Sequence, residues 1–522
     1  MSTKTASKSN IASKSNLTEN KHNWTRPIDW TPMPVIADNE NKIAILVPVT
    51  PSNYSTVGSQ FMSFGCNVSS GSYYVDWGDG TNNTYSGGTV AQHEYFPNNI
   101  TSAVTSRGYK TALIVVTPVT SGASFTSFEL GTPTSNVPTI SNSIFLDVIA
   151  NTTNTNATIS PNNNFRPAIM CERIIWNDKF RIPAASTCFS EMKSLEVLPA
   201  KIKFSLSPQN AYGLFINCHS LEYIPELVDL NIATGAPTIS FSSAFAQCYR
   251  LKEIPYINIP SGITCNNIFS NCFEITYLPA LNINPTGTAA SCFSNCYKLK
   301  DVSRATFNFT NTTDLSNFFS GCYQLENFPS FASITSTCTT LNAAFQECRK
   351  MAVIPTIGNT SGVTNMSSMF SGCISITKAN DLGINPIACN TFANMFQNCL
   401  SLQEVMYPFT GSFKTIPTGT SAFSATFSGC LNLKRITLGQ TLPTNQTIFG
   451  FPSYGHLSEV EIAGINFTTT VANNCLSGPV LNNIYTNLAS GVSAKTITVT
   501  GNFGTATDTP AIATAKGWTV TG

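Results

Sequence analysis

The chain has 522 residues, which is enough for two or three domains, and its formal net charge is +1. Charged residues make up only 11% of it, well below the roughly 25% of an average globular protein. This composition argues against electrostatic capture of nucleic acid, which needs clustered Lys and Arg. The sequence holds no apolar run of about 18 residues, so we expect no membrane insertion.

Residues 1–40 are predicted to form a flexible, extended attachment segment. The first half is polar and mildly basic, with a near-duplicate at residues 6–10 and 12–16, and it lacks the apolar core of a secretory signal peptide. Such a sequence stays disordered on its own. Trp24 and Trp30 follow it, and aromatic anchors beside a flexible basic strand suit folding onto a partner. We therefore expect this segment to bind other proteins of an assembly; a free terminus is the alternative.

Residues 41–150 are β-rich and are predicted to form one sandwich domain. Their signature is a strand that runs into a tight turn containing Asp76, Trp77, Gly78, Asp79 and Gly80. Glycine permits the positive φ of such a turn, and Asp caps it with an Asx hydrogen bond. Calcium binding by the two aspartates is the alternative, but it needs about six to eight oxygens and no further acidic cluster is visible. With the apolar run at 112–116, this order resembles PKD-like Ig-fold domains; residues 151–165 are predicted as a linker.

Residues 166–440 repeat one phrase ten times: Phe, two residues, Cys, two residues and an apolar residue. The copies lie 24 to 31 residues apart. A period of this length with fixed apolar positions indicates a solenoid, whose coils must stack because none buries its own apolar face. The anchor pairs are Phe189–Met192, Phe215–Cys218, Phe245–Cys248, Phe269–Cys272, Phe293–Cys296, Phe319–Cys322, Phe345–Cys348, Phe370–Cys373, Phe396–Cys399 and Phe427–Cys430.

Each copy is expected to hold a short helical or 3₁₀ segment, because its apolar residues are three apart, and then a short strand such as residues 221–227. The cysteines allow three interpretations: disulfides, a metal array or buried thiols. Each copy has one anchor Cys, the chain has only four histidines and an odd 17 cysteines, and Met192 replaces one anchor Cys. Since Cys packs as a small apolar residue, buried thiols are favoured, and no metal or cofactor is expected.

The repeated phrase resembles the BspA-type leucine-rich repeats over about residues 170–440. The resemblance implies a right-handed solenoid with a parallel sheet on one face. Residues 441–522 are predicted as terminal repeats and a C-terminal cap, with helices near 480–488 and 510–517 and a last strand at 518–520. The expected fold class is mainly β: a PKD/Ig-like sandwich followed by a leucine-rich repeat solenoid with a cap.

The order of these parts resembles structural proteins of marine tailed phages. The resemblance implies a virion surface protein (a decoration, fibre or appendage) assembled in the host cytoplasm. It would dock through its N-terminal region and present the solenoid to a host surface glycan or protein, with homo-oligomers left open. A cellular BspA-type adhesin is the alternative, and a polysaccharide depolymerase is less favoured. No phosphate loop, HExxH or GxSxG motif occurs and the carboxylates are scattered, so no catalytic residue is assigned and an enzyme is not expected.

Overall fold

The computed structural model places the chain in two compact units. The N-terminal unit comprises residues 1–209 and 217–231, and the C-terminal unit comprises residues 210–216 and 232–522. The structure describes residues 19, 22–50, 61–130, 144–161, 170–205, 210–230, 240–254, 256–257, 259, 262–413, 422–442, 451–452 and 455–522. Predictions for residues 1–18 and for 162–165 of the linker lie outside these ranges.

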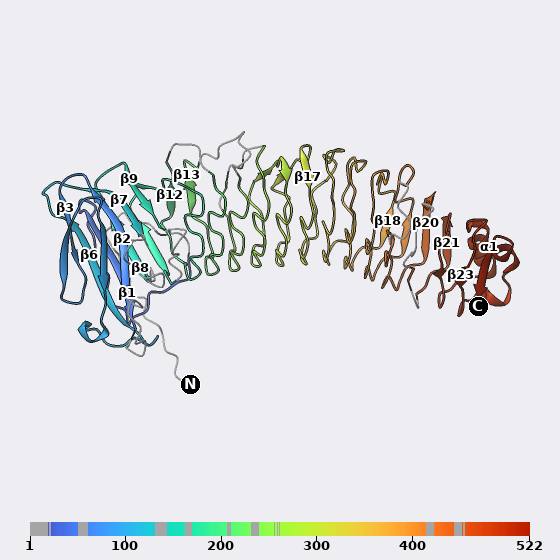
Figure 1. Cartoon of the computed structure of the whole chain (residues 1–522), viewed down its shortest axis with the longest axis horizontal. Helices are drawn as coiled ribbons and strands as arrows, with labels where there is room; N and C mark the ends of the chain where they lie inside the picture. The colour runs from blue at the N-terminus through green and yellow to red at the C-terminus, as the bar shows by residue number, and fades with distance from the viewer. Residues whose placement is uncertain are drawn as a thin grey trace. The chain divides into compact units, whose positions relative to one another are not determined.

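A six-stranded and a five-stranded β-sheet make up most of the described part of the N-terminal unit, drawn in blue to green in Figure 1. The first sheet has the strand order β10-β8-β1-β6-β3-β4, and only the β10–β8 pair is parallel. Its strands are β1 (Lys42–Val49), β3 (Ser72–Asp76), β4 (Asn82–Ser86), β6 (Lys110–Pro118), β8 (Asp147–Asn151) and β10 (Arg173–Trp176). Most residues of β1 are buried rather than alternating, because side chains on both faces of this strand are covered; Ala44 and Leu46, for example, pack in clusters with Ile36 and Trp30.

The second sheet has the order β11-β9-β7-β2-β5. Its strands are β2 (Phe61–Val68), β5 (Val90–Glu94), β7 (Phe125–Leu130), β9 (Ala157–Ser160) and β11 (Phe180–Arg181), and the 3₁₀ helix η1 (Pro97–Asn99) follows β5. The ring of Phe64 in β2 packs 5.8 Å from that of Trp77, which follows β3 of the first sheet. Aromatic side chains therefore join the two sheets; the PKD or Ig assignment of this arrangement stays a prediction.

The predicted linker is wrong in its described part. Strand β8 ends at Asn151, and β9 occupies residues 157–160 of the predicted linker, where it pairs in parallel with β7. Only residues 152–156 form the connection between them. Asn and Thr dominate this stretch, so its polar composition indicated a linker. The strand signal is short: it consists of Ala157 and Ile159, two alternate residues whose side chains are buried.

At the β10 edge of the first sheet and the β11 edge of the second, the next segment of the chain is added in parallel, as in a stack of coils. A parallel bridge joins Arg173 of β10 to Val197, and another joins Ile182, just after β11, to Phe204. Next come β12 (Lys201–Lys203) and β13 (Glu226–Val228), which pair in parallel with each other.

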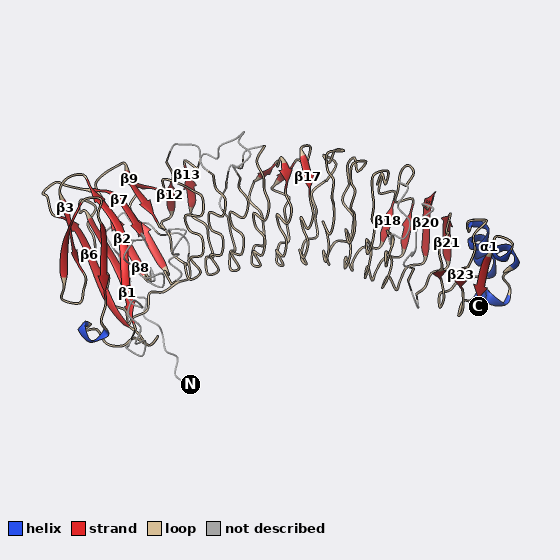
Figure 2. Cartoon of the chain, viewed as in Figure 1, coloured by secondary structure: helices blue, strands red, loops and turns tan. Residues whose placement is uncertain are grey.

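The C-terminal unit is a stack of coils, as the yellow-green to orange part of Figure 1 shows. Its strands are short and parallel: β14 (Asn282–Ile283), β15 (Gly287–Thr288), β16 (Thr306–Phe307), β17 (Thr312–Asp314), β18 (Lys378–Asn380), β19 (Glu404–Met406), β20 (Arg435–Thr441) and β21 (Glu459–Ala463). Elsewhere single parallel bridges join neighbouring coils, for example Tyr277 to Asp301 and Asp301 to Asn327. Loops and turns therefore dominate this stack (Figure 2). The predicted fold class, a mainly β solenoid, is confirmed.

The predicted helical segment at the Phe and Cys anchors is wrong. Each copy instead makes consecutive tight turns, with a left-handed residue two before the Phe and another two after it; around Phe293 these are Ser291 (φ 56°) and Asn295 (φ 60°). The backbone N–H groups of Ser291, Phe293 and Asn295 donate to carbonyls of the next coil at 2.7–2.9 Å. Those of Ser294 and Cys296 bond within their own coil. Two left-handed residues per copy exclude a continuous right-handed helix.

The residue just before the Cys slot carries the sequence signal for this conformation. Asn and Gly tolerate left-handed backbone best, and they fill most of these positions. In chain order the positions hold Glu191, Asn217, Gln247, Asn271, Asn295, Gly321, Glu347, Gly372, Asn398 and Gly429, all with positive φ.

The C-terminal end contains the predicted helices and strands. They are β22 (Thr469–Thr470), α1 (Gly478–Asn487), β23 (Lys495–Thr498), the 3₁₀ helix η2 (Phe503–Ala506), α2 (Ala511–Thr514) and β24 (Trp518–Thr521). Strands β22, β23 and β24 form a parallel sheet, and Leu481, Ile484 and Tyr485 are the apolar residues that α1 buries. Within the described ranges, no helix is long and apolar enough to cross a membrane.

Candidate recognition surface and its supporting core

The repeat anchors form the interior of the coils. None of the ten Phe residues or the Cys and Met residues paired with them is more than 2% exposed. In the C-terminal unit the Phe rings stack in one column from Phe215 to Phe427, with ring centroids of successive copies 5.3–6.4 Å apart. Offset stacking of this kind adds to the stabilisation from apolar burial. The anchors thus fix the positions of the outward-facing residues between them.

The anchor cysteines have a role that packing alone did not suggest. In nine copies the Cys thiol donates to the backbone carbonyl of the Phe anchor in the preceding copy, at sulfur–oxygen distances of 2.9–3.2 Å. Cys296, for example, donates to the carbonyl of Phe269 at 3.2 Å. Ala would be too small and would lack the donor, whereas Cys supplies both bulk and a weak S–H bond. Met192 fills the slot in the first copy, which no Phe anchor of the repeat precedes.

The structure holds all 17 cysteines as thiols, and all except Cys475 are buried. Burial raises the pKa of Cys296 to about 12 and that of Cys265 to about 12. A protonated thiol is required for the S–H bonds to the Phe carbonyls, so the raised pKa and the hydrogen bonding agree. Across the described ranges, His, Cys, Asp and Glu form no group of three that could hold a metal ion.

An outward column of side chains follows directly after the Cys slot. Tyr249, Phe273, Tyr297 and Tyr323 lie on four successive coils, with ring centroids 5.0, 4.8 and 4.8 Å apart and planes within 10° of parallel. The guanidinium of Arg349 lies 4.4 Å from the ring centre of Tyr323 and ends the stack with a cation–π contact.

The same column becomes aliphatic in the next three copies. Ile374, Leu400 and Leu431 occupy the position after the Cys slot and are 37–48% exposed. We call the whole column, from Tyr249 to Leu431, the ridge. Sequence reasoning missed it, although the run of Tyr, Phe, Tyr and Tyr after four successive anchor cysteines is visible in the sequence.

A second outward column carries charges of alternating sign on strands β18 to β21. It consists of Lys378, Glu404, Arg435 and Glu459. The Lys378 ammonium lies 3.1 Å from the Glu404 carboxylate, and the Arg435 guanidinium lies 2.5 Å from that of Glu459. Hydrogen bonds from Lys378 and Asn380 lower the pKa of Glu404, and the hydrogen bond from Arg435 lowers that of Glu459. The column is therefore neutral as a set, because each carboxylate faces a cation.

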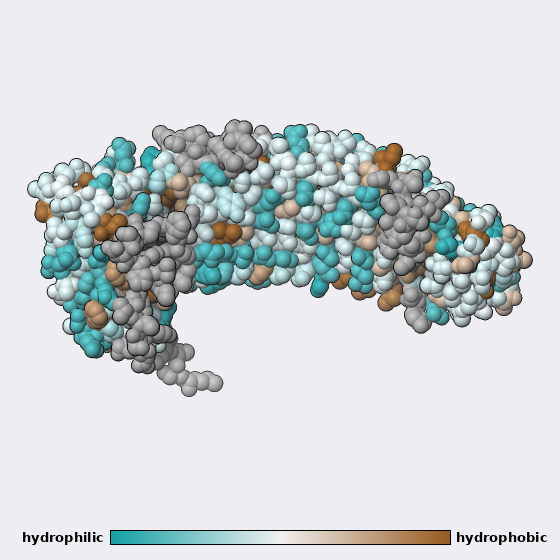
Figure 3. All heavy atoms as spheres, in the orientation of Figure 1, coloured by the Kyte–Doolittle hydropathy of each residue, from teal (hydrophilic) through white to brown (hydrophobic). Residues whose placement is uncertain are grey.

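The face shown in Figure 3 is mainly hydrophilic to neutral, with small, separate hydrophobic patches. This agrees with the low charge of the sequence. A surface of this kind favours hydrogen bonds and apolar contacts over long-range electrostatic attraction.

The predicted turn of the N-terminal unit uses both of its aspartates internally. Asp76 accepts the backbone N–H of Gly78 at 2.9 Å, and Asp79 accepts that of Thr81 at 3.0 Å. The other Asp79 oxygen lies 2.8 Å from Nε2 of His93, whose ring stacks on Trp77. Burial raises the pKa of Asp79, but the hydrogen bonds from Thr81 and His93 outweigh it, so the pKa is lowered. These contacts account for the conformation of the turn.

Gly78 and Gly80 both have positive φ, at 74° and 89°. A side chain at Gly78 would place its Cβ 2.4 Å from the backbone oxygen of Leu113, whereas a Cβ at Gly80 would meet nothing within 4 Å. Glycine at position 78 is therefore needed for close backbone approach as well as for its φ angle.

Trp24 and Trp30 do not lie where the attachment prediction put them. Trp30 is buried, with the guanidinium groups of Arg26 and Arg107 at 5.5 and 5.3 Å from its ring. The Trp24 indole N–H donates to Glu172 at 2.8 Å. Both rings therefore pack on their own unit, which corrects the prediction that they are exposed anchors for a partner.

Arg26 ties the same segment to the sheet. Its Nε donates to the buried carboxylate of Asp147 at 2.9 Å, and Arg173 of β10 donates to the same carboxylate at 2.7 Å. The backbone N–H of Thr31 bonds to the Thr111 hydroxyl of β6. We call residues 22–36 the strap; it is part of the folded N-terminal unit.

Comparison with known proteins gives one family match. Residues 313–425, within the predicted BspA-type repeats, match the family model described as "Mycoplasma protein of unknown function, DUF285". No curated protein matches the chain. One similar solved structure is that of the plant peptide hormone receptor RGFR1 in complex with RGF2, at 11% identity and a TM-score of 0.21, covering 66% of this chain and 60% of the receptor chain. This chain thus spans less than two thirds of the receptor chain it matches. The central coils are therefore similar to a DUF285 repeat solenoid, a fold compatible with a surface or adhesin role.

Proposed function

We propose that this protein is a non-enzymatic surface protein of a tailed-phage virion, and that its coil stack recognises a host surface. The observation that carries the proposal is the ridge, in which successive coils present one side chain each at a fixed position outside a rigid interior. Solenoids commonly use such extended surfaces for binding. The partner is a surface glycan or protein of the host.

The chemistry of the coil surface supports recognition by contact rather than by charge. Apart from Arg349, the ridge consists of aromatic and aliphatic side chains, and the column on β18 to β21 pairs its carboxylates with cations. Carboxylates held in such pairs are poor general acids or bases at neutral pH, because the cation lowers their pKa. The proposal therefore contains no catalytic step.

The virion assignment rests on the order of parts in the sequence, from the "DWGDGT" turn through the repeats to the closing "ATAKGWTV". Because the strap belongs to the folded unit, the proposed attachment segment is reduced to residues 1–18. Their composition, with lysines spaced by Ser and Asn, suits ordering on a partner.

A cellular adhesin is the second candidate. The match of residues 313–425 to a family described from Mycoplasma favours it, since it places such coils in cellular proteins. The two candidates share the recognition surface and differ in where the protein is displayed.

Location is tested by mass spectrometry of purified particles from a producing culture. A virion protein is expected in the particles at a fixed ratio to the capsid protein, and a variant lacking residues 1–18 should fold but be absent from them. Detection on the cell surface, with none in the particles, would establish the adhesin instead.

Recognition is tested with the full chain on host cells. The triple substitution Ile374→Asp, Leu400→Asp and Leu431→Asp should weaken binding by at least about tenfold, because it places charges in an apolar contact. Val353→Asp is the matched control: Val353 is an exposed apolar residue outside the ridge. Binding should persist at high salt. Equal binding by the triple variant and the wild type would remove the ridge from the recognition surface.

A further inference from the structure

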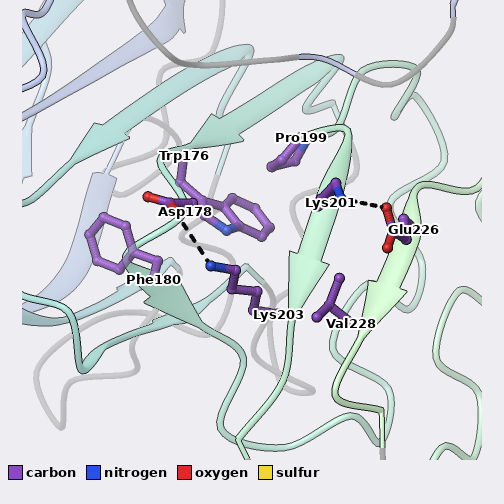
Figure 4. A pocket seen from close by; sticks show the side chains of 8 residues that line it. All are labelled: Trp176, Asp178, Phe180, Pro199, Lys201, Lys203, Glu226 and Val228. Carbon is purple, nitrogen blue, oxygen red and sulfur yellow. Dashed lines mark hydrogen bonds and ion pairs between the residues drawn. The ribbon is translucent and has the colours of Figure 1, made fainter.

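A pocket of about 350 Å³ lies on the parallel strands of the N-terminal unit (Figure 4). Trp176 ends β10, Phe180 begins β11, and Asp178 lies in the turn between these two strands. Alternate residues of a strand point to the same side, and β12 and β13 each contribute such a set. These are Lys201 and Lys203 of β12, with Pro199 just before it, and Glu226 and Val228 of β13. The volume falls in the range of ligand sites, about 300–1,000 Å³.

The base of the pocket is apolar and fixed. Trp176 and Phe180 are almost completely buried, and the Trp176 ring stacks nearly parallel to that of Phe189 at 6.4 Å. Pro199 and Val228 add aliphatic surface. A base held by core packing keeps its shape when a ligand enters, so little ordering is needed on binding.

Two exposed ion pairs form the rim. Lys201 lies 2.9 Å from Glu226 across the β12–β13 pair, and Lys203 lies 3.5 Å from Asp178. Asp178, Lys201 and Glu226 are more than half exposed. Exposed ion pairs of this kind contribute little to the stability of a fold. Each lysine and carboxylate can therefore leave its partner and bind a ligand group at a low cost in free energy.

The rim therefore offers two donors and two acceptors of balanced charge around an apolar base. An anionic ligand would be repelled by two carboxylates, and a cationic ligand by two ammonium groups. A neutral ligand with several hydroxyls and one apolar face satisfies all four groups, since each hydroxyl both donates and accepts. Among common biological molecules, a neutral sugar has this chemistry.

We propose that this pocket binds one neutral monosaccharide unit, free or at the end of a glycan. Asp178 and Glu226 accept hydrogen bonds from sugar hydroxyls, and Lys201 and Lys203 donate to them. The apolar face of the sugar lies against Val228, which is partly exposed, while the buried Trp176 and Phe180 rings support the base from below. The site lies in the N-terminal unit, and it stands whether or not the ridge of the C-terminal unit recognises a host surface.

The test uses the full chain with a panel of methyl glycosides of glucose, galactose, mannose and N-acetylglucosamine, observed by saturation-transfer NMR. At least one should bind saturably with a Kd on the order of 1 mM, as expected for a small site with few contacts. The double variant Asp178→Asn, Glu226→Gln should bind it about tenfold more weakly, because amides are weaker acceptors than carboxylates. The control Glu459→Gln removes an exposed, ion-paired carboxylate of the C-terminal unit and should leave the Kd unchanged.

Three results would overturn the proposal. One is that no glycoside of the panel binds at about 20 mM, well above the expected Kd. Another is that the double variant, shown to be folded by its circular dichroism, binds as tightly as the wild type. The third is that glucuronic acid binds in preference to every neutral glycoside, which would assign the lysines to an anionic ligand.

Discussion

Replacing Phe319 with Ala should strongly destabilise the coil stack. Phe319 has no exposed surface, and its ring lies between those of Phe293 at 5.4 Å and Phe345 at 6.4 Å. It also makes an edge contact with Phe318 at 4.8 Å. Phe→Ala substitutions in cores cost about 3–5 kcal/mol, and aromatic pairs contribute about 0.5–1.5 kcal/mol each beyond burial. We therefore expect a loss near the upper end, about 4–5 kcal/mol.

The control for this substitution is Tyr323→Ala, at the residue that directly follows the Cys of the same anchor phrase. Tyr323 also stacks, on Tyr297 at 4.8 Å, but it is partly exposed on the ridge. Its loss should cost about 1–2 kcal/mol, since less surface returns to water and no closed cavity forms.

The comparison is made by urea denaturation of the full chain, followed by hydrogen exchange of residues 262–413. Exchange is needed because a repeat stack can open locally, and a single unfolding curve does not report one free energy for two units. A loss below about 1 kcal/mol for Phe319→Ala, or equal losses for both variants, would show that the Phe column does not form the stabilising core.

Three further predictions concern thiols, the glycine turn and the strap. Alkylation of the native protein at pH 9 should label Cys475 alone, because burial keeps the other thiols away from the reagent, whereas the denatured protein should be labelled at all 17 cysteines. Labelling of most thiols in the native state would contradict their burial. Gly78→Ala should lower the free energy of unfolding by at least about 2 kcal/mol more than Gly80→Ala. Both substitutions place Ala at a positive φ, but only the new Cβ at position 78 clashes with the backbone of Leu113. Equal losses of stability in thermal unfolding would show that the backbone at Leu113 does not approach Gly78 closely. Asp147→Asn removes the buried carboxylate that pairs with Arg26 and Arg173, and it should lower the free energy of unfolding by about 3–5 kcal/mol. The strap should then be cleaved by a protease under native conditions. A strap that stays protected would show that its aromatic contacts are sufficient to hold it on the unit.

The burial of the strap also changes what a truncation is expected to do. If residues 1–40 were the flexible segment predicted from the sequence, their removal would leave a folded protein. The structure predicts instead that this deletion destabilises the N-terminal unit, because it removes Arg26 and Trp30 from their contacts with Asp147 and Arg107. Deletion of residues 1–18 alone is the cleaner test of attachment.

Ten copies of one apolar phrase at a regular period were enough to predict a solenoid, because such copies have no packed alternative to stacking. The helix near 480–488 was also readable from the helical spacing of its apolar residues, and the one near 510–517 from Pro at its start and Gly at its end. The last strand at 518–520 was likewise predicted.

Contacts between distant parts of the chain resolve what local spacing leaves ambiguous. Residues three apart share a face both in a helix and in consecutive tight turns, and only the hydrogen bonds from Phe293 and Asn295 to the next coil settle which backbone forms. The bond from the Cys296 thiol to the Phe269 carbonyl likewise joins residues of different copies. The local sequence around Trp24 and Trp30 does not show whether these residues bind a partner or pack on their own chain. In each case the deciding contact joins residues far apart in sequence, and a pattern of near neighbours carries no information about it.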